Sequence, residues 1–193
     1  MESGETGGFP TAFQQQRGDP MKAYMILFSV GKDRPGIVDD ISLFLFERSA
    51  NIEDSRMAVM GGCFSIMILF TCSPERVAAI RADLESLGKL GLKATLHEAE
   101  DPATTPVRPA LPLSIEVLAM DHPGIVQKVV RILRDHNINI QSLNTEIKRA
   151  PLSGADLFNL NLQAAVPVGK PITEVKEQLT ALAAELNLDL SFK

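Results

Sequence analysis

Residues 33–38 read Asp-Arg-Pro-Gly-Ile-Val, and residues 121–126, which lie 88 positions later, read Asp-His-Pro-Gly-Ile-Val. The same spacing carries Asn51-Ile52 onto Asn139-Ile140. A register that is shared across a helix-length gap indicates an internal repeat. Further along, Phe64 falls on Phe158 at a spacing of 94, which places six additional residues in one hairpin of the second copy. The chain therefore carries one structural unit twice.

The first copy has the residue pattern of a βαββαβ unit. Apolar residues at helical spacing after the turn at 33–36 predict a helix from residue 37 to about residue 49. Gly61-Gly62, between two β-rich runs, predicts a tight hairpin turn of the primed type. Pro74 suits the first turn of a second helix, which Gly88 and Gly91 end. The apolar stripe of that helix is Val77, Ile80, Leu84 and Leu87, and the expected strands are 23–31, 51–60, 63–72 and 92–97.

The second copy repeats this order, with a longer loop over 149–154. Its expected strands are 113–120, 139–148, 156–165 and 188–192, and its expected helices are 124–136 and 171–186. The predicted fold class is α+β, with two ferredoxin-like βαββαβ domains whose antiparallel sheets carry the helices on one face. The predicted organisation is a disordered tail over 1–20, domains over 21–98 and 112–193, and an extended, proline-rich linker over 99–111.

Composition and charge argue against several functions. The chain has a net charge of −5, no Trp and one Tyr, whereas a protein that holds nucleic acid by itself normally presents a basic face. We therefore expect no direct nucleic-acid binding. No apolar run approaches the roughly 20 residues of a membrane-spanning helix, so we expect no membrane contact. Cys63 and Cys72 are nine apart, which places them on opposite faces of a strand and favours two reduced cysteines in a cytoplasmic protein.

The two copies differ on the sheet face that points away from the helices. In the second copy, polar residues alternate with apolar ones along the strands, so that this face carries the polar residues and is expected to be exposed to solvent. The polar residues are Ser114, Glu116, Asn159, Asn161 and Gln163, and the first copy has Ile26, Phe28, Val30, Met67 and Leu69 on the corresponding face. Because an apolar outer face is usually covered, we expect this face to pack against another chain, as in a homodimer, or against the N-terminal tail.

The repeated turn is the candidate ligand site. Pro35 pre-sets the entry to the helix, and Asp33, like Asp121 in the second copy, is placed to cap its free N–H groups. Gly36, which has no Cβ, lets a ligand approach the helix N-terminus. That terminus carries partial positive charge and unpaired N–H groups, which suit a carboxylate. Asp33 or Asp121, with backbone carbonyl groups, would attract an α-ammonium group. The same residues also make an ordinary helix start, so the motif alone leaves a purely structural role open.

The residues between Asp and Pro differ, because Arg34 in the first copy becomes His122 in the second. Two sites with different ligands and a single competent site therefore both remain possible. His97 and His136 fall in other elements than His122, and the sequence has no Ser/His/Asp or Cys/His set, HExxH motif or phosphate loop. We expect no catalytic residues, no metal and no cofactor.

A D-x-P-G-I-V turn after a first strand, followed beyond the helix by an Asn-Ile strand start, resembles the ACT domain family. The resemblance covers residues 22–98 and 112–193, and the tandem arrangement is similar to the glycine cleavage system transcriptional repressor group. It implies an amino-acid ligand at interfaces between ACT units. The candidate ligand-binding residues are Asp33, Arg34, Pro35, Gly36, Ile37 and Asn51, and Asp121, His122, Pro123, Gly124, Ile125 and Asn139, with the two asparagines completing the pockets.

These observations favour a regulator that binds an amino acid, such as glycine or serine, and passes its state to a partner protein. Such a partner would connect it to the transcriptional control of amino-acid metabolism, because the chain itself lacks a basic DNA-reading surface. The alternative is a structural or assembly protein with degenerate pockets that acts only through protein–protein contacts. A small enzyme is the third hypothesis, and it requires a catalytic set that the sequence does not display.

Overall fold

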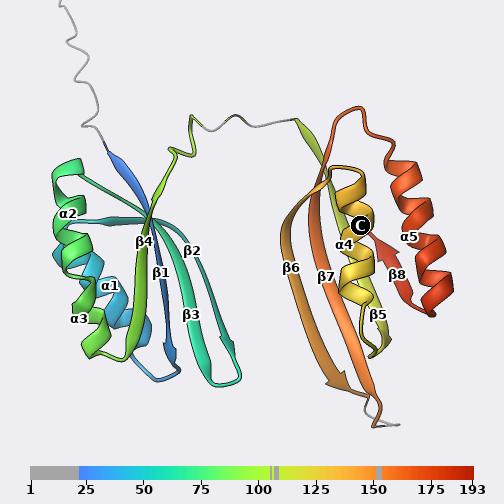
Figure 1. Ribbon diagram of the computed structural model, residues 1–193, viewed down its shortest axis with the longest axis horizontal. Coiled ribbons are helices and arrows are strands. Elements are labelled where there is room, and N and C mark those ends of the chain that lie inside the picture. Colours follow the sequence, from blue (N-terminus) through green and yellow to red (C-terminus); the bar gives the residue numbers. More distant parts are fainter. Residues whose placement is uncertain (1–21, 105, 107–108, 151–153) are drawn as a thin grey trace, which may run out of the picture. The chain divides into compact units, whose positions relative to one another are not determined.

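The computed structural model of the protein describes residues 22–104, 106, 109–150 and 154–193. The predicted tail, residues 1–20, lies outside the described residues. The chain divides into two compact units, unit 1 (1–105) and unit 2 (106–193), which Figure 1 displays. Each unit has the element order βαββαβ and its own hydrophobic core, so the fold predicted from the repeat is confirmed. None of the described helices is long and apolar enough to cross a membrane.

Unit 1 is a four-stranded antiparallel sheet in the order β2-β3-β1-β4. Its helices lie on one face of the sheet (Figure 1). The opposite face is called the outer face below. The elements are β1 (Ala23–Lys32), α1 (Ile37–Glu47), β2 (Asn51–Met60), β3 (Cys63–Cys72), α2 (Pro74–Ala82), α3 (Leu84–Lys89) and β4 (Leu92–Ala99). The hairpin between β2 and β3 is of the predicted kind, because Gly61 and Gly62 both have positive φ, 57° and 76°.

The second helix of unit 1 differs from the prediction, because it is broken at Asp83 into α2 and α3. Both the backbone N–H and the hydroxyl of Ser86 donate to the carbonyl oxygen of Asp83, at 2.9 and 2.7 Å. A serine that bonds three residues back in this way competes with the regular helical pattern. The apolar stripe nevertheless continues across the break, since Ile80 and Leu87 are both buried.

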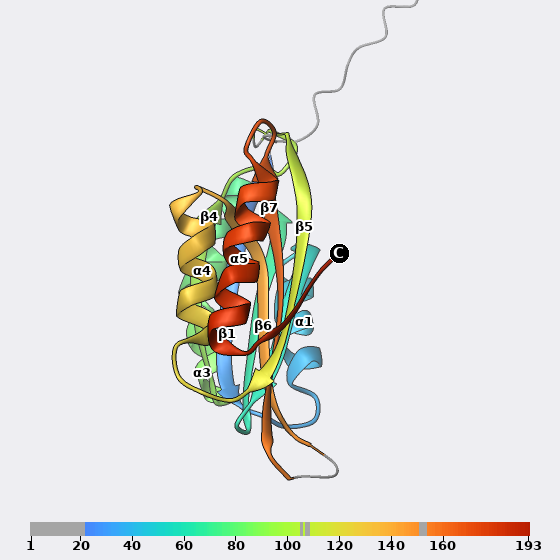
Figure 2. The same ribbon diagram turned by 90° about the vertical axis from the view of Figure 1, so that its right-hand side faces the viewer.

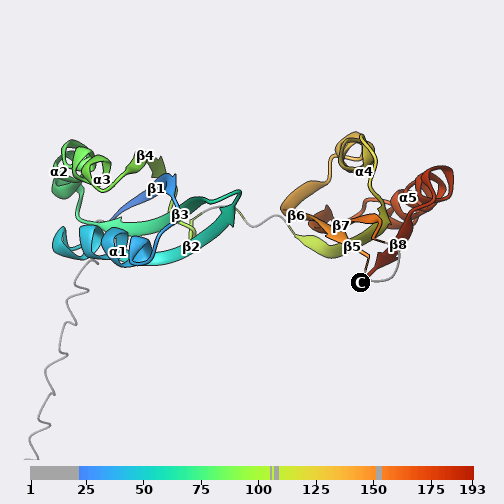
Figure 3. The ribbon, with the colours of Figure 1, turned by 90° about the horizontal axis from the view of Figure 1, so that it is seen from below.

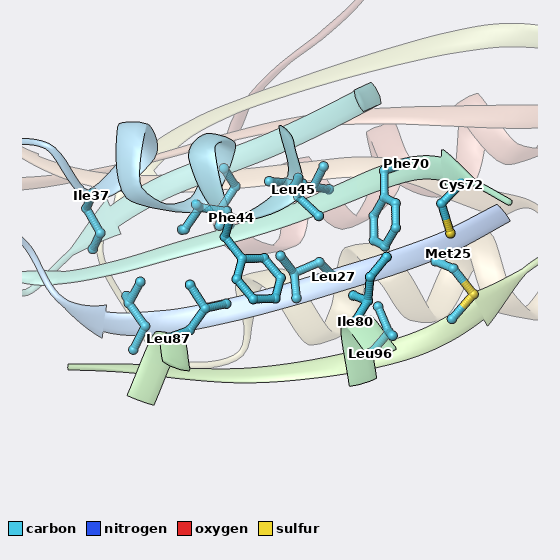
Figure 4. Close-up of a cluster of buried hydrophobic side chains, with 14 of the residues drawn as sticks. Met25, Leu27, Ile37, Phe44, Leu45, Phe70, Cys72, Ile80, Leu87 and Leu96 are labelled. Atoms are coloured by element: carbon cyan, nitrogen blue, oxygen red, sulfur yellow. The ribbon is translucent and has the colours of Figure 1, made fainter. Parts of the chain in front are cut away.

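The core of unit 1 lies between the sheet and these helices. Figure 4 shows Leu27 and Phe70 on neighbouring strands pointing into the same interior as Leu45 of α1 and Ile80 of α2. All four side chains are fully buried. Ser29 is also fully buried on this side of β1, and its hydroxyl has no hydrogen-bond partner among the described residues. This hydroxyl is a polar defect in an otherwise apolar core.

Unit 2 repeats the architecture with the strand order β6-β7-β5-β8. Helices α4 and α5 lie side by side on one face of its sheet, as Figures 2 and 3 show. The elements are β5 (Ala110–Met120), α4 (Ile125–Asp135), β6 (Asn139–Arg149), β7 (Asp156–Pro167), α5 (Ile172–Leu186) and β8 (Asp189–Phe192). Residues 151–153 of the predicted long loop lie outside the described residues.

Strand β5 begins at Ala110, three residues earlier than predicted and within the predicted linker. The early start places Pro112 inside a strand, a position that proline tolerates only where no ladder hydrogen bond is needed. Ser114 exchanges two backbone hydrogen bonds with Lys193, both 3.1 Å. Backbone N–H groups two residues apart in a strand point to the same neighbour, so the nitrogen of Pro112 points to the side of β5 on which Ser114 bonds Lys193. Among the described residues, no strand pairs with β5 on that side at Pro112.

The outer faces of the two sheets differ as predicted. Phe28 and Met67 are direct cross-strand neighbours on unit 1, with exposed fractions of 41% and 47%. The equivalent neighbours on unit 2 are Glu116 and Asn161. Cys63 is exposed and Cys72 is buried, which confirms that the two cysteines lie on opposite faces. What covers the outer face of unit 1 stays a prediction.

Candidate ligand-binding turns

Each candidate turn joins the first strand of a unit to its first helix and is fastened to the neighbouring hairpin. The backbone N–H of Asp33 donates to the carbonyl oxygen of Gly62 at 3.0 Å, and that of Asp121 donates to Asp156 at 3.1 Å. The two acceptors are 94 residues apart, the spacing that relates the later strands of the copies. The repeat therefore extends to the hydrogen bonds that hold the turns.

The turns end in glycines that cap the helices through their backbone. Gly36 and Gly124 have φ of 83° and 100°, and their carbonyl oxygens accept the first helical hydrogen bonds, from Asp40 at 2.9 Å and Lys128 at 3.0 Å. Neither helix has a side-chain cap. A Cβ added to Gly124 would meet nothing within 4 Å. The first-turn N–H groups thus lack a side-chain partner, and the backbone before them can be approached closely.

The prediction that Asp33 and Asp121 cap these helices is wrong. A capping side chain must sit at the residue directly before the helix, from which it reaches the N–H groups of the first turn. Here that residue is glycine, and the aspartates lie three positions earlier at the ends of the strands. Pro35 and Pro123 directly precede the capping glycines, so they shape the approach to the helix rather than its first turn.

The turn of unit 1 is occupied by its own side chains. Arg34 Nη2 donates to Asp40 Oδ2 at 2.6 Å and to the carbonyl oxygen of Leu90 at 3.3 Å. Asp39 adds a second carboxylate in the first turn of α1. Negative side chains at a helix N-terminus satisfy its partial positive charge, so an external carboxylate gains less there.

The first helical turn of unit 2 lacks these negative charges. Gln127 and Lys128 stand where unit 1 has Asp39 and Asp40, and the first turn of α4 contains no acidic residue. Lys128 Nζ donates to Glu185 Oε1 of α5 at 3.1 Å, and 42% of the lysine side chain remains exposed. His122 Nδ1 lies 3.2 Å from the carbonyl oxygen of Pro123. The helix N-terminus of unit 2 therefore keeps its attraction for an anion.

The prediction that Asn51 and Asn139 complete the pocket of their own unit is wrong. Asn51 pairs with Thr71 at one end of the sheet, whereas Lys32, the last residue before the turn, pairs with Cys63 at the other end. The 11 residues of α1 separate them by about 16 Å. Asn139 lines a hollow of about 420 Å³ together with Arg134, near the C-terminal end of α4. The β-strand that follows the helix starts where the helix ends, far from its N-terminus.

Comparison with known proteins agrees with this architecture. The profile of the ACT domain matches residues 23–97 and again residues 113–162. The chain belongs to the ACT domain family. The glycine cleavage system transcriptional repressor of Escherichia coli (strain K12) is 28% identical over 167 residues, which cover 85% of this chain and 86% of the repressor. The Shigella flexneri repressor gives the same figures.

A solved structure of an unknown protein from Galdieria sulphuraria is similar over both ACT domains. It is 29% identical, has a TM-score of 0.77, and the match covers 90% of this chain and 98% of that one. These likenesses confirm the tandem ACT arrangement and support a regulatory, ligand-binding role for the chain.

Sequence reasoning missed several residues around the ACT turns. In unit 1 these include Asp40 and Leu90, both partners of Arg34. Gly31 lies close by, and a Cβ on it would come within 2.6 Å of the carbonyl oxygen of Gly91. Helical periodicity could have indicated Asp40, because the fourth residue after the capping glycine lies on the same side of the helix as the turn.

The side chain of Asn51 has a partner within its own strand. Its amide donates to Glu53 Oε1 at 3.0 Å, and the hydroxyl of Thr71 donates to the same oxygen at 2.9 Å. The hydrogen bond from Asn51, followed by that from Thr71, holds the pKa of Glu53 below its ordinary value. These contacts surround the register shift between Ile52 and Asp54, so Asn51 supports the irregular start of β2.

Proposed function

We propose that this ACT protein is a non-catalytic regulator that binds a small amino acid at the β5–α4 turn of unit 2 and passes its bound state to a partner protein. The observation that carries the proposal is the charge of the first turn of α4. With Gln127 and Lys128 at these positions, the first turn of α4 has no acidic residue of its own, whereas that of α1 has two.

The carboxylate of the ligand would bind at the uncapped first turn of α4. Three backbone N–H groups, those of residues 125–127, lie before the first helical hydrogen bond. The partial positive charge of the helix N-terminus, with Lys128 one turn away, favours a carboxylate there. Gly124 leaves the space beside this backbone open. In unit 1 the ion pair between Arg34 and Asp40 occupies the corresponding position.

The ammonium group of the ligand would be attracted by Asp121, which is exposed at the start of the same turn. Both charges of a free amino acid would thus be matched within one segment. A ligand with a small side chain suits this turn, because the proposed contacts are made by backbone N–H groups, which the ligand must approach closely. The link of the E. coli relative to the glycine cleavage system supports glycine or serine as the first ligands to test.

Regulation by such a ligand requires that it bind one state of the protein more tightly than another. The net charge of −5 disfavours direct DNA contact. A role in transcription would therefore operate through a partner protein, to which the ligand-bound state is presented.

A thermal-shift screen of the twenty amino acids tests the proposal. A ligand at about 100 times its dissociation constant stabilises the native state by about 2.7 kcal/mol, so a true ligand raises the unfolding temperature as its concentration rises. Glycine, serine or another small amino acid is expected to do so. No shift with any of the twenty at millimolar concentration would contradict the proposal.

A structural or assembly role is the second candidate, and the apolar outer face of unit 1 favours it. Under this alternative the turns are ordinary helix starts, and the protein acts only through surface contacts. A negative amino-acid screen combined with self-association would support it.

A further inference from the structure

We propose that the outer face of unit 1 is the surface through which two copies of this chain form a symmetric dimer. The proposal is separate from ligand binding, because it concerns the opposite side of the sheet from the helices. Five apolar residues on the two central strands make up the surface, and they are called the apolar patch: Ile26, Phe28 and Val30 of β1, and Met67 and Leu69 of β3.

The apolar patch is continuous because its members are neighbours in the strand register. Ile26 is paired with Leu69 and Phe28 with Met67, so the side chains form adjacent rows across β1 and β3. Phe28 and Met67 are 41% and 47% exposed, and the other members are half-buried. Contiguous apolar surface of this kind on a sheet marks an interaction site more often than scattered single residues do.

Unit 2 provides an internal control for this reading. Its sheet has the same strand order, and the positions of Phe28 and Met67 hold Glu116 and Asn161, which are also cross-strand neighbours. The ACT fold therefore tolerates a polar outer face in this same chain. The apolar patch of unit 1 is not a requirement of the fold, so it needs an explanation of its own.

The charges that flank the apolar patch suit a second copy as the partner. On β2, Glu53, Asp54 and Arg56 leave one net negative charge, with Arg56 ion-paired to Asp54. On β4, exposed Lys93 is positive, and His97 lies two rows from it on the same face. A twofold axis parallel to the strands places β2 of one copy over β4 of the other. In this arrangement Asp54 of one copy faces His97 of the other, and Lys93 faces Ala58, because each pair shares one row of the strand register. No like charges therefore face each other directly, which a symmetric interface requires.

The size of the face permits such a dimer. Four strands about 4.8 Å apart, over about eight residues of about 3.4 Å each, give a face of about 500 Å². Two facing sheets therefore bury about 1,000 Å², which reaches the lower limit of specific interfaces. An interface of this size predicts a reversible dimer whose population depends on protein concentration.

Sedimentation equilibrium of the full chain tests the proposal. At tens of micromolar, the wild-type mass should approach twice the 21.0 kDa of one chain and fall on dilution. The double variant Phe28→Glu, Met67→Asn introduces the residues that unit 2 has at these positions, and it should raise the dimer dissociation constant at least tenfold. Leu118→Gln is the matched control, because Leu118 is 43% exposed on the outer face of unit 2. This control should leave the dimer unchanged.

A monomeric wild-type chain overturns the proposal, and so does a double variant that folds and remains dimeric. Cooperative thermal unfolding followed by circular dichroism verifies the fold. If the double variant does not fold, Met67→Asn alone should still weaken the dimer at least threefold. The labelling rate of exposed Cys63 with a maleimide, against buried Cys72 as reference, gives a second measurement. Slow labelling of Cys63 in a monomer would assign the covering to another part of the same chain and overturn the dimer.

Discussion

Arg34 and Asp40 are joined across the first turn of α1, with Nη2 and Oδ2 2.6 Å apart. The residues at the same two positions of unit 2 are His122 and Lys128, two bases that cannot form an ion pair with each other. The two ACT turns therefore share their backbone and their glycine cap but differ in charge. This difference leads to the first prediction.

Replacing Gln127 and Lys128 by aspartate, as in unit 1, should weaken amino-acid binding at least tenfold, because two carboxylates then repel the ligand carboxylate at the helix N-terminus. Isothermal titration calorimetry measures the affinity. Glu185→Gln is the control, since it removes the ion-pair partner of Lys128 without adding acid to the turn. Equal affinity in the aspartate variant and the wild type would place the ligand elsewhere.

Gly124→Ala should destabilise unit 2 by about 1–2 kcal/mol, because a residue with a Cβ is strained at positive φ. The φ of Gly124 is 100°, and an added Cβ meets nothing within 4 Å, so the cost comes from the backbone alone. Urea unfolding measures the loss. Gly88→Ala, in helix α3 with no positive φ and no close neighbour, should instead stabilise unit 1 by about 0.4–1 kcal/mol. A neutral Gly124→Ala would contradict the capping geometry.

Ser29→Ala should leave unit 1 as stable as the wild type or up to about 1 kcal/mol more stable, because it removes a buried hydroxyl that has no partner among the described residues. Unit 2 has Val117 at the equivalent position. Ser65→Ala serves for comparison, as the hydroxyl of Ser65 donates to the carbonyl oxygen of Ala58 at 3.4 Å and its removal should bring no gain. A loss of more than 1 kcal/mol in Ser29→Ala would reveal a hydrogen bond to Ser29.

The pKa of Glu53 should rise in Asn51→Ala and, by a smaller amount, in Thr71→Val, because each removes a hydrogen bond to its carboxylate. The folded pKa lies below the unfolded one, so the contribution of Glu53 to stability is present above the unfolded pKa and is lost as pH falls through the folded pKa. Carboxyl-carbon NMR titration follows the group directly. An unchanged Glu53 pKa in both variants would contradict the two contacts.

The elements of both ACT units were predictable because their signals are local. The Gly61-Gly62 hairpin, the helix after each D-x-P-G turn and the polarity of each sheet face follow from neighbouring residues alone. The break at Asp83 was not predictable in this way. The break coincides with a hydrogen bond from the hydroxyl of Ser86 to the carbonyl oxygen of Asp83, three residues earlier. The same serine is compatible with an unbroken helix.

Less of the candidate site was predictable. The capping glycines were found from the motif, but the aspartates were assigned a capping role that the chain path does not allow. Asn51 was placed beside the turn because it begins the next strand, whereas the intervening helix carries it to the far end of the unit. Side-chain direction also mattered, because the partners of Arg34 come from α1 and from the loop before β4.

Pro112 has a consequence for how this protein behaves at high concentration. A bare strand edge is a template on which a foreign strand can grow, and this is a common route to fibrils. Where β5 extends beyond β8, proline supplies no N–H to the exposed edge, so an incoming strand would find a gap in its ladder. Because the nitrogen of Pro112 has no hydrogen to donate, polymerisation at that edge is disfavoured, although the strand keeps its full length.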